Sequence, residues 1–500
     1  MAPEDTKKSI GKKVARNFSV MFAAQIVGWI AGFILLYFLP RYLGSEDFGR
    51  LYLALSVKMI LGLLIDFGGN YLIPKEVSRS VKVGSKIMSS YILLRIGLWL
   101  LSIGAILLFS DLLGYSDHVN LLILILAIAK LWEGSTTAFS AFFQGIEKME
   151  YPSLGTITER VFVAAVSVMA LLYGADSTTM AIIITIGAFL NLLVVFWFSR
   201  RYVKISYTFD KQIFGLLHSG MPYFLFSLFS VIYYRIDALM LASMTSTEVT
   251  GWYGGAYRFF DIVMVLPLLY RTAVFPVFSK LWNDKKGILE STLQESIRLM
   301  LILGIPTAAV IFLFSENIIH FFMGLEEYSA SVLILQIFAL SIPIIYIDII
   351  LGSAIMGAAN KQNAWAIVGL LAIFVNIISN IILIPYTQDV YMNGGIGAAI
   401  ATLITETFVM VCAIWILPGT YFSGFKLSYI AKPLLATVIM VLPVLLLIQT
   451  GLYWIINLLI AGIVYLIALY IIKTFKPEEE KLISDQIRNG LKKITLHLKK

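Results

Sequence analysis

The sequence predicts an all-α integral membrane protein of about fourteen transmembrane helices. Hydrophobic residues make up 59% of the 500 residues and charged residues only 14%, whereas a soluble protein carries about 25% charged residues. The mean hydropathy is +0.87. A large soluble core does not explain these values, because cores divide into separate domains beyond roughly 250–300 residues. Most of the surface must therefore face lipid.

The individual helices are predicted from apolar stretches of about 20 residues, the length that crosses the hydrocarbon core of a bilayer. The turns near 174–178 and 449–452 are very short, so the helix count depends most on these two places. The predicted spans are residues 18–39, 51–73, 88–109, 119–143, 157–174, 178–199, 213–243, 251–275, 294–315, 331–357, 363–386, 395–417, 429–449 and 452–472.

The positive residues predict the orientation of these helices. Of the 38 Lys and Arg residues, 28 lie in alternate connections, and only Arg41 and Arg50 lie in the opposite set. Because positive residues are retained on the cytoplasmic side, both termini are expected in the cytoplasm of a multi-pass plasma-membrane protein. The first apolar run is too long for a cleaved signal peptide and is expected to stay as an anchor.

An internal repeat predicts how the helices are grouped. Glu46 and Gly49 recur 202 residues later as Glu248 and Gly251. Six helices separate the two copies, so both lie on the same side of the membrane, as in transporters built from two parallel lobes. The predicted parts are a basic cytoplasmic segment (1–17), an N-lobe of helices 1–6 (18–199), a C-lobe of helices 7–12 (200–417), an added helix pair (418–472), and a basic tail (473–500) that forms an amphipathic helix on the inner leaflet or stays solvated.

Charged residues inside the predicted helices are the candidate functional residues. A charge at the centre of the bilayer costs about 2.5–3.5 kcal/mol, so each should face a cavity or a partner. Asp237 and Arg258 lie equally far from the turn between their helices, so they could form a pair. The candidates for substrate binding are Lys58, Arg95, Lys130, Arg235, Arg258 and Arg271, and those for ion coupling or charge balance are Asp66, Glu133, Asp237 and Asp261.

The excess of cations over acids in this set favours a central cavity for an anionic head group. The alternative is that opposite charges form buried ion pairs that fix the register of the helices. Other chemistry is not indicated: the lone Cys412 and four scattered histidines have no metal-ligand spacing. There is also no nucleophile–base motif or phosphate-binding glycine loop. We therefore expect no catalytic residue, metal or cofactor, and the scattered positive charge predicts no nucleic-acid partner.

Several motifs resemble a known family. They are Tyr-Arg-Ile-Asp at 234–237, Gly-Trp-Tyr-Gly-Gly-Ala-Tyr-Arg at 251–258 and Phe-Pro-Val-Phe-Ser at 275–279, with further likeness at 41–49 and 394–402. They resemble the O-antigen-type polysaccharide-biosynthesis flippases of the multidrug/oligosaccharidyl-lipid/polysaccharide exporter superfamily. The likeness extends to about residue 420 and marks the family more specifically than the substrate.

The resemblance implies a two-lobed transporter that flips a lipid-pyrophosphate-linked oligosaccharide to the outer leaflet by alternating access, while the lipid tail stays in the bilayer. Arg235, Asp237 and Arg258 match the charged motif of the family. Glycosyltransferases or a polymerase of the same pathway are the implied protein partners.

Three other functions are less consistent with the sequence. A cation-coupled, multidrug-type antiporter of the same superfamily predicts an acidic cavity, whereas these helices are richer in Arg and Lys. A membrane glycosyltransferase or polysaccharide polymerase needs a large outward loop with acidic catalytic residues, but the longest predicted outward connection runs only from about 316 to 330. A scaffold or channel function would not explain the charged residues in the predicted helices 7 and 8.

Overall fold

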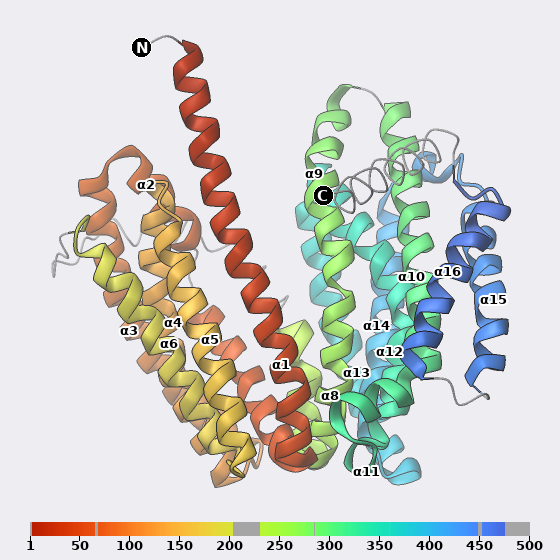
Figure 1. Ribbon diagram of the computed structural model, residues 1–500, viewed down its shortest axis with the longest axis horizontal. Helices are drawn as coiled ribbons and strands as arrows, with labels where there is room; N and C mark the ends of the chain where they lie inside the picture. Colours follow the sequence, from red (N-terminus) through yellow and green to blue (C-terminus); the bar gives the residue numbers. More distant parts are fainter. Residues whose placement is uncertain are drawn as a thin grey trace, which may run out of the picture. The chain divides into compact units, whose positions relative to one another are not determined.

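The computed structural model describes residues 3–65, 69–203, 231–284, 286–359, 361–448 and 453–475 (Figure 1). Within these residues, twelve helices are long and apolar enough to cross a membrane. They confirm the predicted all-α membrane protein. Asp66, residues 213–230 of the seventh predicted helix, the turn at 449–452 and the tail from residue 476 lie outside the described residues.

Twelve spans rather than fourteen are counted for two reasons. The seventh predicted helix is described only from residue 231, and the first two predicted helices form one span, Ser19–Gly62. They belong to α1 (Pro3–Ile65), which departs from helical geometry at Gly44, with φ 74° and ψ 171°. A Cβ atom at this position would lie 2.7 Å from Glu327 Oε2. Both the backbone angle and the close approach therefore favour glycine.

The contacts divide the chain into two compact units. Unit 1 comprises Met1–Phe259, Ile318–Ile334 and Ala366–Thr405, and unit 2 comprises Phe260–Asn317, Leu335–Trp365 and Glu406–Lys500. These units group segments by proximity and do not test the predicted division into lobes, which stays a prediction.

Unit 1 contains the N-terminal helices. In this unit α4, α5 and α6 lie side by side, and α1 packs against α4 and α5 (Figure 1). A cluster of buried apolar side chains from α2, α4 and the end of α6, including Ile73, Phe142 and Val195, holds these helices together. The described helices that lie wholly in this unit are α1, α2 (Gly69–Arg79), α3 (Val81–Leu112), α4 (Asp117–Gly145), α5 (Glu150–Leu172), α6 (Ser177–Ser199), the helix at 231–244 and α11 (Leu325–Tyr328).

Five of the described helices contribute residues to both units: α8 (Thr247–Val263), α10 (Lys286–Met323), α12 (Ala330–Asp348), α13 (Gln362–Tyr391) and α14 (Gly394–Ile416). Most of α13 belongs to unit 1. Unit 2 contains α9 (Val265–Asp284), the π-helix η1 (Ile349–Met356), the short helix η2 (Gly419–Phe422), α15 (Ser428–Ile448) and α16 (Trp454–Ile471).

The last two helices form a pair in unit 2. α15 and α16 pack side by side (Figure 1). The Tyr465 hydroxyl of α16 donates a hydrogen bond to the Ile302 carbonyl of α10 at 2.7 Å, and Gln294 Nε2 of α10 donates to the Tyr421 carbonyl at 3.0 Å. The first contact therefore connects α16 to α10, and the second connects η2, which precedes the helix pair, to the same helix.

The two copies of the repeated motif meet within unit 1. A Cβ atom at Gly49 would lie 1.8 Å from the Thr247 carbonyl oxygen, and one at Gly251 would lie 1.9 Å from the Ser45 carbonyl oxygen. Ser45 and Thr247 are separated by the same 202 positions as the two glycines. A contact in which each copy uses the same residues is what a two-fold relation between repeats produces. Both glycines allow backbones to approach closely.

Candidate functional site

One cluster of charged side chains lies between α1 and α4. Lys58 of α1 forms an ion pair with Glu133 Oε1 of α4, and the Lys130 ammonium lies 3.4 Å from Glu133 Oε2. The Lys130 side chain crosses Gly62, where a Cβ atom would be 2.5 Å from Lys130 Cε. Two ammonium groups thus share one carboxylate, so these three residues together carry positive charge inside apolar helices.

Arg95 of α3 lies beside the same carboxylate-bearing segment. Its side chain is almost completely buried, with 2% exposure. Its Nη1 donates a hydrogen bond to the carbonyl of Gly134, the residue after Glu133, and its guanidinium lies 4.4 Å from the centre of the Tyr91 ring. A guanidinium over an aromatic face is an attractive arrangement. Four predicted site residues, Lys58, Arg95, Lys130 and Glu133, therefore come together; we call them the Glu133 cluster.

A second buried acid has neutral partners. Asp237, in the helix at 231–244, is 4% exposed. Its Oδ1 accepts a hydrogen bond from Asn380 Nδ2 at 2.6 Å, and its Oδ2 accepts from the Tyr253 hydroxyl at 2.9 Å and from Thr402 Oγ1 at 3.2 Å. Asn380 also donates to Asn376 Oδ1 at 3.0 Å. The residues of this Asp237 cluster come from four helices, so the carboxylate ties them together.

Arg235 lies two residues before Asp237 and contacts aromatic residues of both repeats. Its Nη1 donates a hydrogen bond to the Tyr52 hydroxyl at 3.2 Å. Its guanidinium is also 5.4 Å from the centre of the Tyr257 ring. Tyr52 packs over Gly254, where a Cβ atom would lie 2.6 Å from the ring. Tyr52 of the first repeat therefore orients a cation of the second.

Arg258 makes a related contact. Its guanidinium lies 6.0 Å from the centre of the Phe48 ring, and Phe48 stacks with Tyr52 at 6.4 Å between ring centres. Tyr52 and Lys58 are six residues apart in α1, about 9 Å along the helix axis. The pairing of Arg258 with Asp237 stays a prediction.

Two other predicted site residues, Asp261 and Arg271, are not part of these clusters. Asp261 and Arg271 belong to unit 2, where Asp261 is exposed and Arg271 half-buried. Asp66 lies outside the described residues.

The search for charges missed five residues of the Asp237 cluster and its surroundings: Tyr52, Tyr253, Asn376, Asn380 and Thr402. A signal for two of them existed, because Asn376 and Asn380 are four residues apart in an otherwise apolar stretch and so lie on one helical face. Thr402 has no such signal, since threonine is common in transmembrane helices. Only the fold brings its hydroxyl to Asp237.

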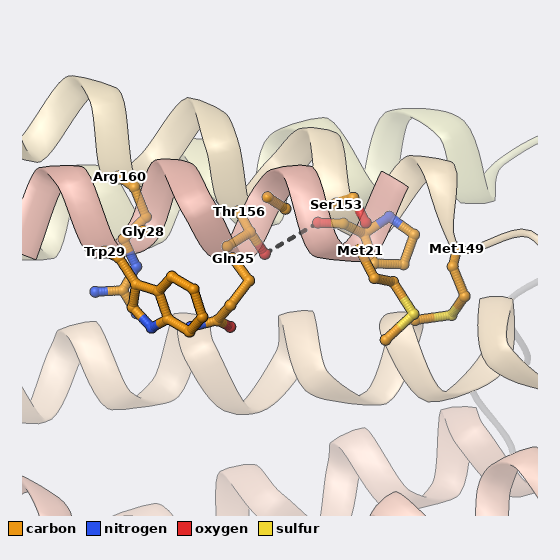
Figure 2. Close-up of a pocket in the computed structure, with 10 residues that line it drawn as sticks. Met21, Gln25, Gly28, Trp29, Met149, Ser153, Thr156 and Arg160 are labelled. Carbon is orange, nitrogen blue, oxygen red and sulfur yellow. Dashed lines mark hydrogen bonds between the residues drawn. The ribbon is translucent and has the colours of Figure 1, made fainter. Parts of the chain in front are cut away.

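A pocket of about 340 Å³ lies between the first part of α1 and α5. Trp29, Gln25 and Arg160 gather at one end and Met21 and Met149 at the other (Figure 2). No predicted site residue lines this pocket, whose lining is Met21, Ala24, Gln25, Gly28, Trp29, Met149, Pro152, Ser153, Thr156 and Arg160.

Comparison with known proteins identifies related families and sequences. A family model described as polysaccharide biosynthesis protein matches residues 14–282, and one described as MatE matches residues 222–382. The chain is 25% identical over 398 residues to a probable low-salt glycan biosynthesis flippase of Haloferax volcanii, covering 78% of this chain and 81% of that protein. It is 22% identical over 419 residues to a capsular polysaccharide biosynthesis protein of Staphylococcus aureus, covering 80% of this chain and 98% of that protein.

The fold is also similar to that of a solved structure. The lipid II flippase MurJ in its inward closed conformation matches with a TM-score of 0.73 at 20% sequence identity. The match covers 91% of this chain and 98% of the other. At this level of identity, the likeness concerns the arrangement of the helices.

Proposed function

Because the chain belongs to the polysaccharide biosynthesis protein family, we propose that it is a flippase for a lipid-pyrophosphate-linked oligosaccharide. It moves this substrate from the cytoplasmic to the outer leaflet by alternating access, for the synthesis of a cell-surface polysaccharide or glycan. The naming of the Haloferax relative as a probable glycan biosynthesis flippase supports this proposal. The observation that carries it is the Glu133 cluster, with its excess of positive charge between apolar helices.

The chemistry of pyrophosphate explains this arrangement. Charge-assisted hydrogen bonds to phosphate oxygens are among the strongest polar contacts in proteins. Lys58 and Lys130 share a single carboxylate, so their combined charge is only partly neutralised and can attract an anion. Arg235 and Arg258 are oriented by aromatic rings, and a planar guanidinium suits two-point contact with phosphate. We propose that these cations guide the head group.

The two buried acids have different proposed roles. Glu133 lies between two ammonium groups, which supports a charge-balancing role. Asp237 accepts hydrogen bonds from an amide and two hydroxyls, which supports an ion-coupling role, because these donors carry no charge.

A flipping assay tests the proposal. Purified protein in proteoliposomes with a fluorescent lipid-linked oligosaccharide should move the glycan between leaflets, and Arg235→Ala and Arg258→Ala should each slow this movement at least about tenfold, the effect of losing one charge-assisted contact. Arg79→Ala is the matched control, since the Arg79 side chain is 64% exposed and pairs locally with Glu76. Normal flipping by both variants, at normal insertion and stability, would contradict the cationic mechanism.

A second candidate function is a cation-coupled, multidrug-type antiporter. The match of the MatE model to residues 222–382 favours it. Such a transporter would exchange organic cations for protons or sodium ions that move down their gradient. The positive charge of the Glu133 cluster would repel these organic cations. Uptake of a cationic dye into the same proteoliposomes distinguishes the two: the flippase proposal expects no uptake, while gradient-driven uptake without glycan movement would support the antiporter.

We further propose that the protein lies in the plasma membrane with both termini in the cytoplasm, and that it moves its substrate without changing it chemically. The distribution of Lys and Arg supports the orientation. Reporter tags at each terminus should be accessible only after the membrane is permeabilised. The recovered glycan lipid should keep its mass, and co-purification can test association with glycosyltransferases or a polymerase of the same pathway.

A further inference from the structure

A pair of buried acids in unit 2 plays no part in the clusters described above. Asp348 is the last residue of α12 and is 5% exposed. Neither of its side-chain oxygens accepts a hydrogen bond from the residues that the structure describes. A buried carboxylate without a partner is costly, because it has lost its hydration without replacement. This side chain therefore requires a ligand or a proton.

Glu406 of α14 is the charged neighbour of Asp348. It is 6% exposed, and its carboxylate interacts electrostatically with that of Asp348. Two carboxylates that are close together and shielded from water repel each other. They cannot both be ionised at the same time unless a cation compensates their charge. The pair thus has the charge and the oxygen atoms that bind a small hard cation or hold a proton.

The backbone around Asp348 is also unusual. The π-helix η1 begins at the next residue, Ile349, and short π-helical segments occur frequently at functional sites. Pro343 lies inside α12 and removes a backbone donor one turn earlier. Pro343 frees the carbonyl of Ala339, nine residues before Asp348, so only the π-helix changes the hydrogen-bond pattern next to this side chain.

Other ionisable groups near Asp348 lie on the surrounding helices. α9 packs against η1 and carries Arg271. Tyr346 on α12 donates its hydroxyl hydrogen to the Val263 carbonyl at 2.8 Å. Residues 299–315 of α10, which approaches α12 where Gly304 meets Pro343, contain no ionisable side chain. Cys412 of α14 interacts electrostatically with Asp348.

We propose that Asp348 and Glu406 form a binding site for one small monovalent cation, either Na⁺ or a proton. The binding of the cation follows from the buried pair itself, whereas its use as a coupling ion rests on the proposed transport function. The site lies wholly in unit 2, so it is distinct from the Asp237 cluster.

Cys412 offers a local test, because it is the single cysteine of the chain. The thiolate is the reactive form of cysteine, and the charge of a nearby carboxylate disfavours it. A cation bound at Asp348 should therefore speed the reaction of Cys412 with N-ethylmaleimide. The experiment measures this rate by mass spectrometry on the purified full-length protein, in NaCl or choline chloride of equal ionic strength, between pH 6 and pH 8.

The expected result has two arms. If the cation is Na⁺, sodium should raise the rate at pH 8 by at least about threefold, as expected when a neighbouring charge is neutralised. If it is a proton, the rate of the unmodified protein should approach that of Asp348→Asn as the pH falls, with no effect of sodium. In either arm the rate in Asp348→Asn should not respond to sodium, and Glu406→Gln should weaken the response.

Asp237→Asn is the control, because it alters the other buried acid and should leave the response of Cys412 unchanged. The proposal is overturned if sodium has no effect and the ratio of the unmodified rate to the Asp348→Asn rate is constant and below one from pH 6 to pH 8, because a proton held throughout this range would make the two rates equal. A permanent counter-charge from Arg271 would produce that outcome. Because the readout is labelling, this failure is separate from any failure of glycan flipping.

Discussion

The two repeats meet at matching glycines, yet they surround their buried acids differently. In the first repeat, Glu133 lies between two ammonium groups. In the second, Asp237 accepts hydrogen bonds from an amide and two hydroxyls. The carboxylate of the first is neutralised by charge, whereas that of the second is held in place by neutral donors. Two acids buried between helices of the same chain are therefore held in different ways, one by charged partners and one by neutral donors.

Glu133→Ala should have the largest effect on stability. It leaves Lys58 and Lys130 without their shared carboxylate, and removing one partner of a buried ion pair costs about 3 kcal/mol. The melting temperature of the detergent-solubilised protein should fall accordingly. Glu76→Ala is the control, because Glu76 pairs with the exposed Arg79 and such surface pairs contribute about 1 kcal/mol or less. Equal effects of the two variants would show that the Glu133 cluster does not depend on charge balance.

Gly49→Ala should have the next largest effect, because it tests what the two repeats share. The added Cβ would collide with the Thr247 carbonyl, and overpacking of this kind costs about 2 kcal/mol. Gly251→Ala should behave alike, since its contact with Ser45 is reciprocal. Flipping should also slow in both. Gly28→Ala is the matched control in α1, because no atom lies within 4 Å of its added Cβ; an equal loss there would contradict the contact.

Asp237→Asn should destabilise less than Glu133→Ala. The new amide keeps one acceptor oxygen but turns an NH₂ group toward a donor, a mismatch of about 1 kcal/mol. If Asp237 couples an ion to transport, the flipping rate of the variant should depend less on sodium or pH than that of the unmodified protein. Thermal unfolding and the flipping assay measure the two effects. A loss of stability as large as that of Glu133→Ala would remove the contrast between the two acids.

Tyr52→Phe should have the smallest effect. It removes the hydroxyl that accepts a hydrogen bond from Arg235 but keeps the ring that packs over Gly254, so we expect a loss of about 0.5–1 kcal/mol in stability. Flipping should slow severalfold because Arg235 is less well oriented. Tyr37→Phe serves for comparison, since the Tyr37 hydroxyl accepts from Arg41 at an exposed position. Identical flipping rates in the two variants would argue against an orienting role for Tyr52.

The sequence predicted several features that the structure also has. Apolar stretches of spanning length predicted the helices, whereas the grouping of these helices into two lobes stays a prediction. Intramembrane charge predicted the members of the Glu133 cluster, because a charge in an apolar helix needs a partner. The neutral members of the Asp237 cluster were not predicted. Asn and Thr carry no charge, so their presence in an apolar helix does not indicate that a partner is needed.

The sequence by itself determined the class of the protein and its candidate charges, because hydropathy and charge are local properties of the chain. Only the tertiary structure decided the partners. Glu133 meets Lys58 across 75 positions of the sequence, Asp237 meets Asn380 across 143, and Asp348 interacts with Glu406. Contacts of this range depend on how helices pack. Whether a buried acid is neutralised by a cation, held by neutral donors or left without a hydrogen bond is therefore decided by the fold.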